Sequence, residues 1–389
     1  MRRHDGFSLI EVVLATALSA IVLASVSAMV NPSHGLFETA LETSDMQQRL
    51  RVAVDSLSRD LTAAGSGAYA AGEAGPLIQS FAPVLPFRRG LSGDAAAGAF
   101  QTDGITLLSV PSTAAQTTLV ADLLPGDVTL RAAANPACPA GTNLCGFTPG
   151  MTVLIYDDTG NFDGFVVAAI SDGAAQITLA SRPADSAATT YRRGARVVEV
   201  RVHVYYLKSD AAAQTFQLMH DDGSAGADVP VVDHIVGLAF EYHGDPMPPS
   251  LTPGGGATYG PAPPDSAMQT TSYPAGENCT FRVEASSGAQ VSRLSALGTG
   301  TALVPLTAAQ LVDGPWCPDE SNANRWDADL LRIRRVAVAI RIEAAVAALR
   351  GPAGVLFSHG GSSRAANRWL PDVELRFQVA PRNMNLAPP

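Results

Sequence analysis

Lysine is almost absent from this chain of 389 residues. Lys208 is the only one, so arginine supplies nearly all of the positive charge, and the net charge is −10. Because this lysine lies outside any Gly-Lys-Ser/Thr sequence, the chain has no phosphate-binding loop of the nucleotide-hydrolase type. The basic residues are dispersed, which argues against a nucleic-acid groove. Composition therefore excludes a motor ATPase and indicates no nucleic-acid partner.

The sequence also lacks a recognisable catalytic motif. No two histidines have the helical spacing of a zinc protease. The sequence Leu356-Phe357-Ser358-His359-Gly360 resembles a nucleophile elbow, but leucine stands where the first glycine belongs, and no strand-to-helix context follows. We therefore predict no enzyme activity, no catalytic residues and no cofactor. The scattered histidines are His4, His34, His203, His220, His234, His243 and His359.

One segment has the alternating oxygen ligands of a calcium loop, although the set is incomplete. Asp157, Asn161 and Asp163 alternate with other residues in this segment, as does Thr159. Phe162 stands where a helix–loop–helix calcium site requires glycine, and no bidentate glutamate closes the loop. Asp, Asn and Gly are also the commonest β-turn residues. A hairpin turn is the favoured interpretation, and calcium is the weaker alternative.

Charge is nearly absent between Phe7 and Val30, where Glu11 is the only charged residue. A run of this length predicts a membrane-spanning helix. Arg2 and Arg3 precede it, which predicts a cytoplasmic N-terminus and a remainder outside the inner membrane. An ionised acid at the bilayer centre costs roughly 2.5–3.5 kcal/mol, so such residues usually have a function and a partner. Glu11 therefore requires an explanation.

The sequence Gly6-Phe7-Ser8-Leu9-Ile10-Glu11, after a short basic leader, resembles a type IV prepilin. The resemblance implies that residues 1–6 are removed by a prepilin peptidase that cuts between Gly6 and Phe7. It also implies N-methylation of Phe7, and a contact between Glu11 and the amine of a neighbouring subunit during assembly. The alternatives are a secretory signal peptide cut near residues 25–28 and a plain membrane anchor. Neither alternative explains Glu11.

An oxidising compartment changes the interpretation of the four cysteines. Cys138 and Cys145 close a short loop, and Cys279 and Cys317 bracket a longer irregular segment. We predict these two disulfides, although four cysteines permit three connectivities. A zinc site is the rival interpretation, but the chain lacks a Cys-x-x-Cys pair and a close histidine.

The helix is expected to continue beyond the membrane segment of residues 7–30. Apolar residues recur at helical spacing through residues 31–66, and Gly65 and Gly67 end the pattern. This predicts one long helix whose second half lays an apolar stripe on a globular domain. Pro32 is expected to kink or loosen the midpoint. The stripe comprises Phe37, Leu41, Met46, Leu50, Val54, Leu57 and Leu61, whereas Arg49, Arg51, Asp55, Arg59 and Asp60 are assigned to other faces.

Beyond residue 67 the pattern changes to short β segments, which together with the helix predicts an α+β, pilin-like fold. Residues 104–110 are expected to enter the main sheet, and residues 117–195 to form a small all-β insertion. One strand over residues 197–206 is expected to start an antiparallel meander that includes 215–220 and 235–242. Residues 244–325 are expected to be irregular and rich in Pro and Gly. The last strands are predicted at 331–342 and 373–380.

Two segments narrow the resemblance within the pilin-like proteins. Residues 48–65 resemble a segment shared by PilW-type minor pilins and J-type pseudopilins of type II secretion, and the ending Pro381-Arg382-Asn383-Met384-Asn385 resembles PilW-type chains. The resemblance implies a non-enzymatic subunit that moves from the inner membrane to a surface filament. Its implied partners are other pilins, the prepilin peptidase/methyltransferase and an inner-membrane assembly platform. A J-type pseudopilin and a tip adhesin remain alternatives.

Overall fold

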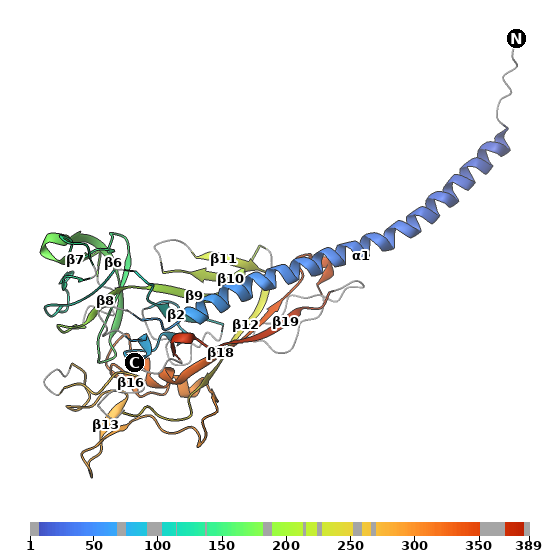
Figure 1. The fold of residues 1–389 in the computed structure, drawn as a ribbon. Coiled ribbons are helices and arrows are strands. Elements are labelled where there is room, and N and C mark those ends of the chain that lie inside the picture. Colours follow the sequence, from blue (N-terminus) through green and yellow to red (C-terminus); the bar gives the residue numbers. More distant parts are fainter. Residues whose placement is uncertain are drawn as a thin grey trace.

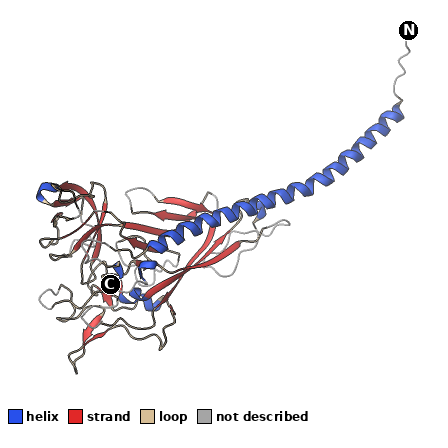
Figure 2. Cartoon of the chain, in the orientation of Figure 1, coloured by secondary structure: helices blue, strands red, loops and turns tan. Residues whose placement is uncertain are grey.

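A single long helix and a β-rich body make up the structure, a computed structural model (Figure 1). The described residues are 8–67, 75–91, 103–113, 115–136, 138–181, 189–212, 215–223, 228–251, 259–265, 270–350 and 370–384, with the backbone alone for 29–36. Helix α1, Leu9–Ala63, has 55 residues. Its first half projects away from the body and its second half lies along the sheets (Figure 2). The expected α+β class is confirmed.

Two antiparallel sheets form the part of the body that contacts α1. The first contains five strands in the order β1-β2-β9-β10-β11, and the second contains four in the order β15-β12-β18-β19. Helix α1 contacts both sheets, and β10 of the first also contacts β12 of the second. The strands of the first sheet are β1 Val84–Pro86, β2 Ile105–Ser109, β9 Arg201–Asp210, β10 Thr215–Asp221 and β11 Val229–Asp233. Those of the second are β15 Val304–Leu306, β12 Ile235–Gly244, β18 Ile333–Ile342 and β19 Val373–Val379.

A third sheet of six strands lies at the end of the body far from the N-terminus (Figure 1). Its order is β3-β8-β5-β6-β7-β4, and it has a core of its own that includes Val153, Phe165 and Tyr191. The chain enters it after β2 and leaves it before β9, although β2 and β9 pair directly in the first sheet. The third sheet is therefore inserted into a connection between two neighbouring strands. Its strands are β3 Gln116–Thr118, β4 Thr129–Arg131, β5 Thr152–Tyr156, β6 Phe162–Ser171, β7 Gln176–Leu179 and β8 Arg196–Glu199.

The predicted strand over residues 197–206 is wrong as a single element. β8 ends at Glu199 in the inserted sheet, and β9 begins at Arg201 in the first sheet. Val200 separates them, and its N–H still donates to Thr152 of the inserted sheet. The predicted meander is also wrong in its last member, because β12 pairs with β15 and β18 and not with β10. Alternation cannot show a change of sheet, because both strands keep apolar faces buried.

Short elements connect the sheets. The irregular segment after β12 contains two small antiparallel pairs, β13 with β14 and β16 with β17. The bounds are β13 Phe281–Val283, β14 Gln290–Ser292, β16 Trp316–Cys317 and β17 Trp326–Asp327. The 3-10 turns are η1 Leu77–Gln79, η2 Asp172–Ala174, η4 Ala309–Leu311, η5 Ala328–Arg332, η6 Ala347–Leu349 and η7 Arg382–Met384.

Helix α1 runs without interruption through the Asn31-Pro32 pair, so Pro32 does not end the helix. The helix bows smoothly along its length in Figure 1. Proline removes one backbone donor, and a helix of this length keeps the hydrogen bonds of the turns on either side.

The apolar stripe of α1 docks over a shorter length than expected. Phe37 and Leu41 are 65% and 57% exposed, and docking begins at Glu42. Each residue that α1 and its C-cap Ala64 bury lies three or four positions from another member of the set, which defines one helical face. Asp60 belongs to this face and is 5% exposed, so its assignment to another face is wrong. Arg49 is also largely covered, because its guanidinium reaches back to Glu42. The buried residues are Glu42, Met46, Leu50, Ala53, Leu57, Asp60, Leu61 and Ala64.

Leu57→Ala should destabilise the body because Leu57 is fully buried between α1 and the sheets. We expect a loss of about 2–5 kcal/mol, the range for removing a buried leucine side chain. Leu41→Ala, on the exposed part of the same helix, should change stability by no more than about 0.5 kcal/mol. Denaturant unfolding of the full chain in detergent micelles measures both, and equal effects would contradict the docking limit at Glu42.

Candidate functional site: the long helix and its attachment

The N-terminus of α1 is closed by a capping box between Ser8 and Glu11. The Ser8 hydroxyl accepts from Ile10 N–H at 3.4 Å, and the Glu11 carboxylate accepts from Ser8 N–H at 3.0 Å. A carboxylate in the first turn is also stabilised by the helix dipole. Glu11 thus has a role within its own chain before any neighbour is present. Gly6 and Phe7 lie outside the described residues.

The first half of α1 has no packing partner among the residues that the structure describes. The helical span Leu9–Ala28 is long and apolar enough to cross a membrane, and none of it is buried in the body. Its apolar side chains cover all sides of the helix, which is typical of a segment that faces lipid or other helices. The small residues expected to permit close helix approach are likewise exposed, namely Ala15, Ala17, Ala20, Ala24 and Ser27.

A buried carboxylate fastens the start of the docked half. Glu42 Oε1 accepts from the backbone N–H of Ala345 at 2.6 Å and from the Arg49 guanidinium at 3.1 Å. Arg49 also pairs with Asp45 at 2.8 Å. The Ala345 bond joins α1 to the segment that follows β18, so the helix is attached by a directed contact as well as by its apolar stripe.

The end of α1 is fastened by the C-terminal residues of the chain. Asn383 Nδ2 donates to Ala63 O at 3.2 Å, and Gly65 N–H donates to Leu108 O of β2 at 2.9 Å. The first bond satisfies one of the carbonyls that a helix C-terminus leaves without internal partners, and the second joins the residue after the cap to β2. Gly65 has φ +83°, and a Cβ there would lie 3.0 Å from Met384, so glycine suits both the backbone and the space. The Arg382-Asn383 ending therefore closes against the helix.

Near the same end, Asp60 meets a polar cluster on the first sheet. Asp60 Oδ2 accepts from Tyr205 Oη at 2.5 Å and lies 3.4 Å from His203 Nδ1. His203 Nδ1 is 2.9 Å from His220 Nε2. Burial lowers the pKa of His203, against the attraction of Asp60, which raises it. Burial, reinforced by the bond to Asp60, raises the pKa of Tyr205 well above its usual value.

Sequence reasoning missed this cluster, although one signal was present. Asp60 lies three residues after Leu57, so it falls on the buried face. His203 and Tyr205 are two apart in β9, and His220 is the register partner of Tyr205. Their common face is thus fixed by strand pairing, which the sequence does not state.

The calcium-candidate segment forms a hydrogen-bonded turn. Asp157 Oδ1 accepts from Thr159 N–H, the Thr159 hydroxyl and Asn161 N–H, and Oδ2 accepts from Asn161 Nδ2. Asp163 faces different partners, Tyr191 at 2.5 Å and Asn324 at 3.1 Å. Burial raises the pKa of Asp157, against these hydrogen bonds. The three candidate ligands serve the turn between the paired strands β5 and β6 and its contacts, as the favoured interpretation expects, and calcium remains the weaker, untested alternative.

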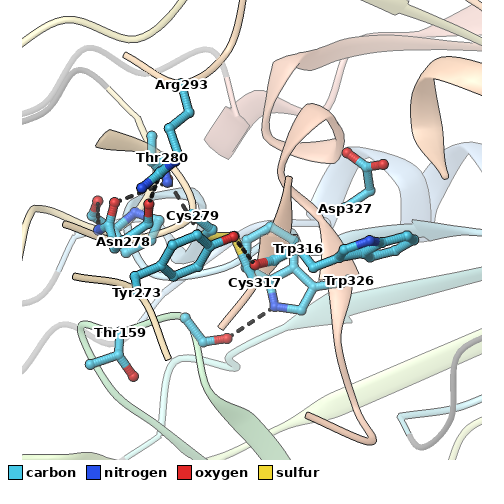
Figure 3. Close-up of a disulfide and its surroundings, with 12 residues drawn as sticks. Thr159, Tyr273, Asn278, Cys279, Thr280, Arg293, Trp316, Cys317, Trp326 and Asp327 are labelled. Carbon is cyan, nitrogen blue, oxygen red and sulfur yellow. Dashed lines mark hydrogen bonds between the residues drawn. A yellow bond between two sulfur atoms is a disulfide. The ribbon is translucent and has the colours of Figure 1, made fainter. Parts of the chain in front are cut away.

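The structure joins Cys138 to Cys145 and Cys279 to Cys317, the two pairs expected from the sequence. Figure 3 shows the second bond within an aromatic cluster. Tyr273 Oη donates to Trp316 O at 2.8 Å, and Trp326 Nε1 donates to Gly160 O at 3.0 Å. The Trp326 bond connects the irregular segment to the inserted sheet, so this disulfide stands where two separate parts of the body meet.

Removing the Cys279–Cys317 bond with a double alanine variant should cost more stability than removing Cys138–Cys145. The sequence separations are 38 and 7 residues. Loop-closure entropy then gives about 4 kcal/mol for the long loop and about 2 kcal/mol for the short one. Calorimetric unfolding of the full chain measures both variants, and a larger loss for the short loop would contradict this order.

Comparison with known proteins bears on the N-terminus. A family model described as the prokaryotic N-terminal methylation motif matches residues 1–27. The chain carries this motif. It is the processing signal of type IV pilins and pseudopilins, so it supports a pilin-like or pseudopilin protein with an apolar N-terminal helix. The match ends before the docked half of α1 and does not distinguish these classes. No curated protein matches the chain.

Proposed function

We propose that this protein is a minor type IV pilin of the PilW type, a non-enzymatic subunit that helps to initiate or cap assembly of a filament. The observation that carries the proposal is the combination of the methylation motif with an exposed apolar helix that holds one carboxylate near its start. The resemblance of residues 381–385 to a segment of PilW-type chains favours the pilus over the secretion system.

The proposed sequence of events follows from what the first half of α1 can contact. Before processing, Leu9–Ala28 lies in the inner membrane with the leader in the cytoplasm and the body in the periplasm. A prepilin peptidase/methyltransferase cuts between Gly6 and Phe7 and methylates the new amine. An inner-membrane assembly platform then transfers the helix from lipid to the helices of other major and minor pilins. Small residues along α1 permit their close approach.

Glu11 sets the position of the helix relative to its neighbour during this transfer. In the isolated chain its carboxylate accepts the N–H of Ser8, which is the residue directly after Phe7. Once residues 1–6 are removed, the cationic amine of a neighbouring subunit can approach the same carboxylate. Pairing offsets the desolvation of both charges, and either charge left alone in an apolar surrounding is strongly unfavourable. The pair would fix the axial position of one helix against the next.

The body would face outward from such a filament. The inserted sheet lies at the end of the molecule remote from the N-terminus, and its separate core supports treating it as a unit of its own (Figure 1). We propose the expected β insertion of residues 117–195, which strands β3 to β8 extend to 116–199, as a subdomain within an outer region that begins at residue 67. A tip adhesin is the further alternative, supported by the remote position of this sheet.

The J-type pseudopilin of a type II secretion system is the closest alternative. It would use the same N-terminal processing and the same docked helix, and it would assemble in a periplasmic pseudopilus. Surface exposure separates the two, because a pilus subunit reaches the outside of the cell. Immunogold labelling of this protein on intact cells would favour the pilin if the gold particles lie along filaments that extend from the cell surface.

Glu11→Gln and Glu11→Ala together test the role of the carboxylate. Glutamine can keep the capping bond to Ser8 N–H while it removes the charge, whereas alanine removes both. We expect both variants to be processed, and incorporation into sheared filaments to fall more than about tenfold in both, because the neighbour's amine loses its counter-charge. Quantitative immunoblots of sheared filaments measure the fall.

Gly6→Val provides the matched control, since a branched side chain should prevent the peptidase from approaching the backbone. It should retain the leader and fail to assemble. Normal incorporation of Glu11→Gln would contradict the charge pair. A fall confined to Glu11→Ala would assign Glu11 to helix capping instead.

A further inference from the structure

Three side chains from three elements, α1, β9 and β10, converge where the end of α1 crosses the first sheet. Strand register places His203 and His220 on one face of β9 and β10, together with Tyr205. Asp60 approaches this face from the last turns of α1. Asp60, His203 and His220 form a group whose ligand atoms all lie within 4.8 Å of one another. Neither histidine belongs to the N-terminal segment that carries the proposed function.

The separations match those within a metal coordination shell. Asp60 Oδ2 lies 3.4 Å from His203 Nδ1 and 3.9 Å from His220 Nε2, and the two nitrogens are 2.9 Å apart. Zinc–nitrogen and zinc–oxygen bonds of 2.0–2.2 Å at tetrahedral angles place ligand atoms about 3.3–3.5 Å apart. The three observed distances bracket this value, so one ion can reach all three atoms after small side-chain rotations.

The rings show which rotation is needed. The imidazole planes of His203 and His220 differ by 11°, with the two nitrogens facing each other. Rotation of the side chains that moves the two nitrogens apart would let both lone pairs point at one ion that Asp60 Oδ2 also reaches. That oxygen also accepts from Tyr205 Oη, and a hydroxyl that orients a ligating carboxylate is common around bound metals.

The surroundings permit access from solvent. The side chains of His203 and His220 are 18% and 22% exposed, and that of Asp60 is 6% exposed. Solvent can therefore reach the two rings. Arg59 pairs with the other oxygen of Asp60 at 3.2 Å, but its side chain is 74% exposed, so solvent screens its charge.

We propose that Asp60, His203 and His220 bind a divalent transition metal of the zinc class, with water in the fourth position. Two imidazole nitrogens and one carboxylate oxygen suit Zn²⁺, Cu²⁺ or Ni²⁺ rather than Ca²⁺ or Mg²⁺, which prefer oxygen ligands. The ion would cross-link the end of α1 to β9 and β10. It would thereby strengthen the attachment of the long helix to the body, whichever filament the helix enters.

Titration of the full chain, without an affinity tag and in detergent micelles, tests the site with Zn²⁺ and Co²⁺. We expect one Zn²⁺ per chain, a rise in the melting temperature, and Co²⁺ absorption bands of a tetrahedral centre. His220→Gln should weaken binding at least about 100-fold, since loss of an orienting neighbour alone costs about 10–100-fold. His243→Gln, a histidine of β12 outside the group, is the matched control and should bind as the parent does.

Metal titration of the unmodified protein is sufficient to contradict the proposal, so the test remains even if a variant fails to fold. Absence of stoichiometric Zn²⁺ binding at millimolar ion, or a Co²⁺ spectrum of an octahedral aquo-like ion, contradicts it. Unchanged affinity in a folded His220→Gln variant contradicts it as well. Circular dichroism of each variant establishes that the fold is retained.

Discussion

The first half of α1 packs against nothing in the described part of its own chain, and this constraint governs the rest of the molecule. Twenty residues, Leu9–Ala28, present apolar side chains on all sides, and none of the span is buried. Such a surface is stable only in lipid or among other helices. The body must therefore hold the second half of the same helix firmly while leaving the first half free. The methylation motif on residues 1–27 agrees with a helix that is first in a membrane and then in an assembly.

The attachment of α1 to the body combines an apolar stripe with carboxylates near both ends of that stripe. Leu50, Ala53, Leu57 and Leu61 provide non-directional burial. Glu42 and Asp60 add directed contacts to the segment after β18 and to β9. A helix held by apolar contacts alone can slide or rotate, whereas hydrogen-bonded carboxylates fix its rotation and position. This matters for a helix that would transmit load between a filament and an outer domain.

The sequence predicted the parts of the fold whose periodicity is local. The long helix, its end near Gly65 and strands such as β2, β10 and β19 follow from spacing within a few residues. The disulfide pairs followed from compartment and loop lengths. The break at Val200 and the placement of β12 in a second sheet depend on strand pairing between distant segments, which periodicity does not encode. The cluster of Asp60, His203 and His220 was not predicted for a related reason. Asp60 is a polar residue on an apolar stripe and was assigned to another face of the helix, and the two histidines meet it only through strand register.

Mass spectrometry of the N-terminal peptide of the mature protein tests the central claim most directly. If the chain is processed as a prepilin, the peptide begins at Phe7, carries a methyl group on its amine and retains Glu11. A mature chain that begins near residue 28, with no methylated phenylalanine, would contradict that claim, because the apolar half of α1 would then have been removed as a secretory signal.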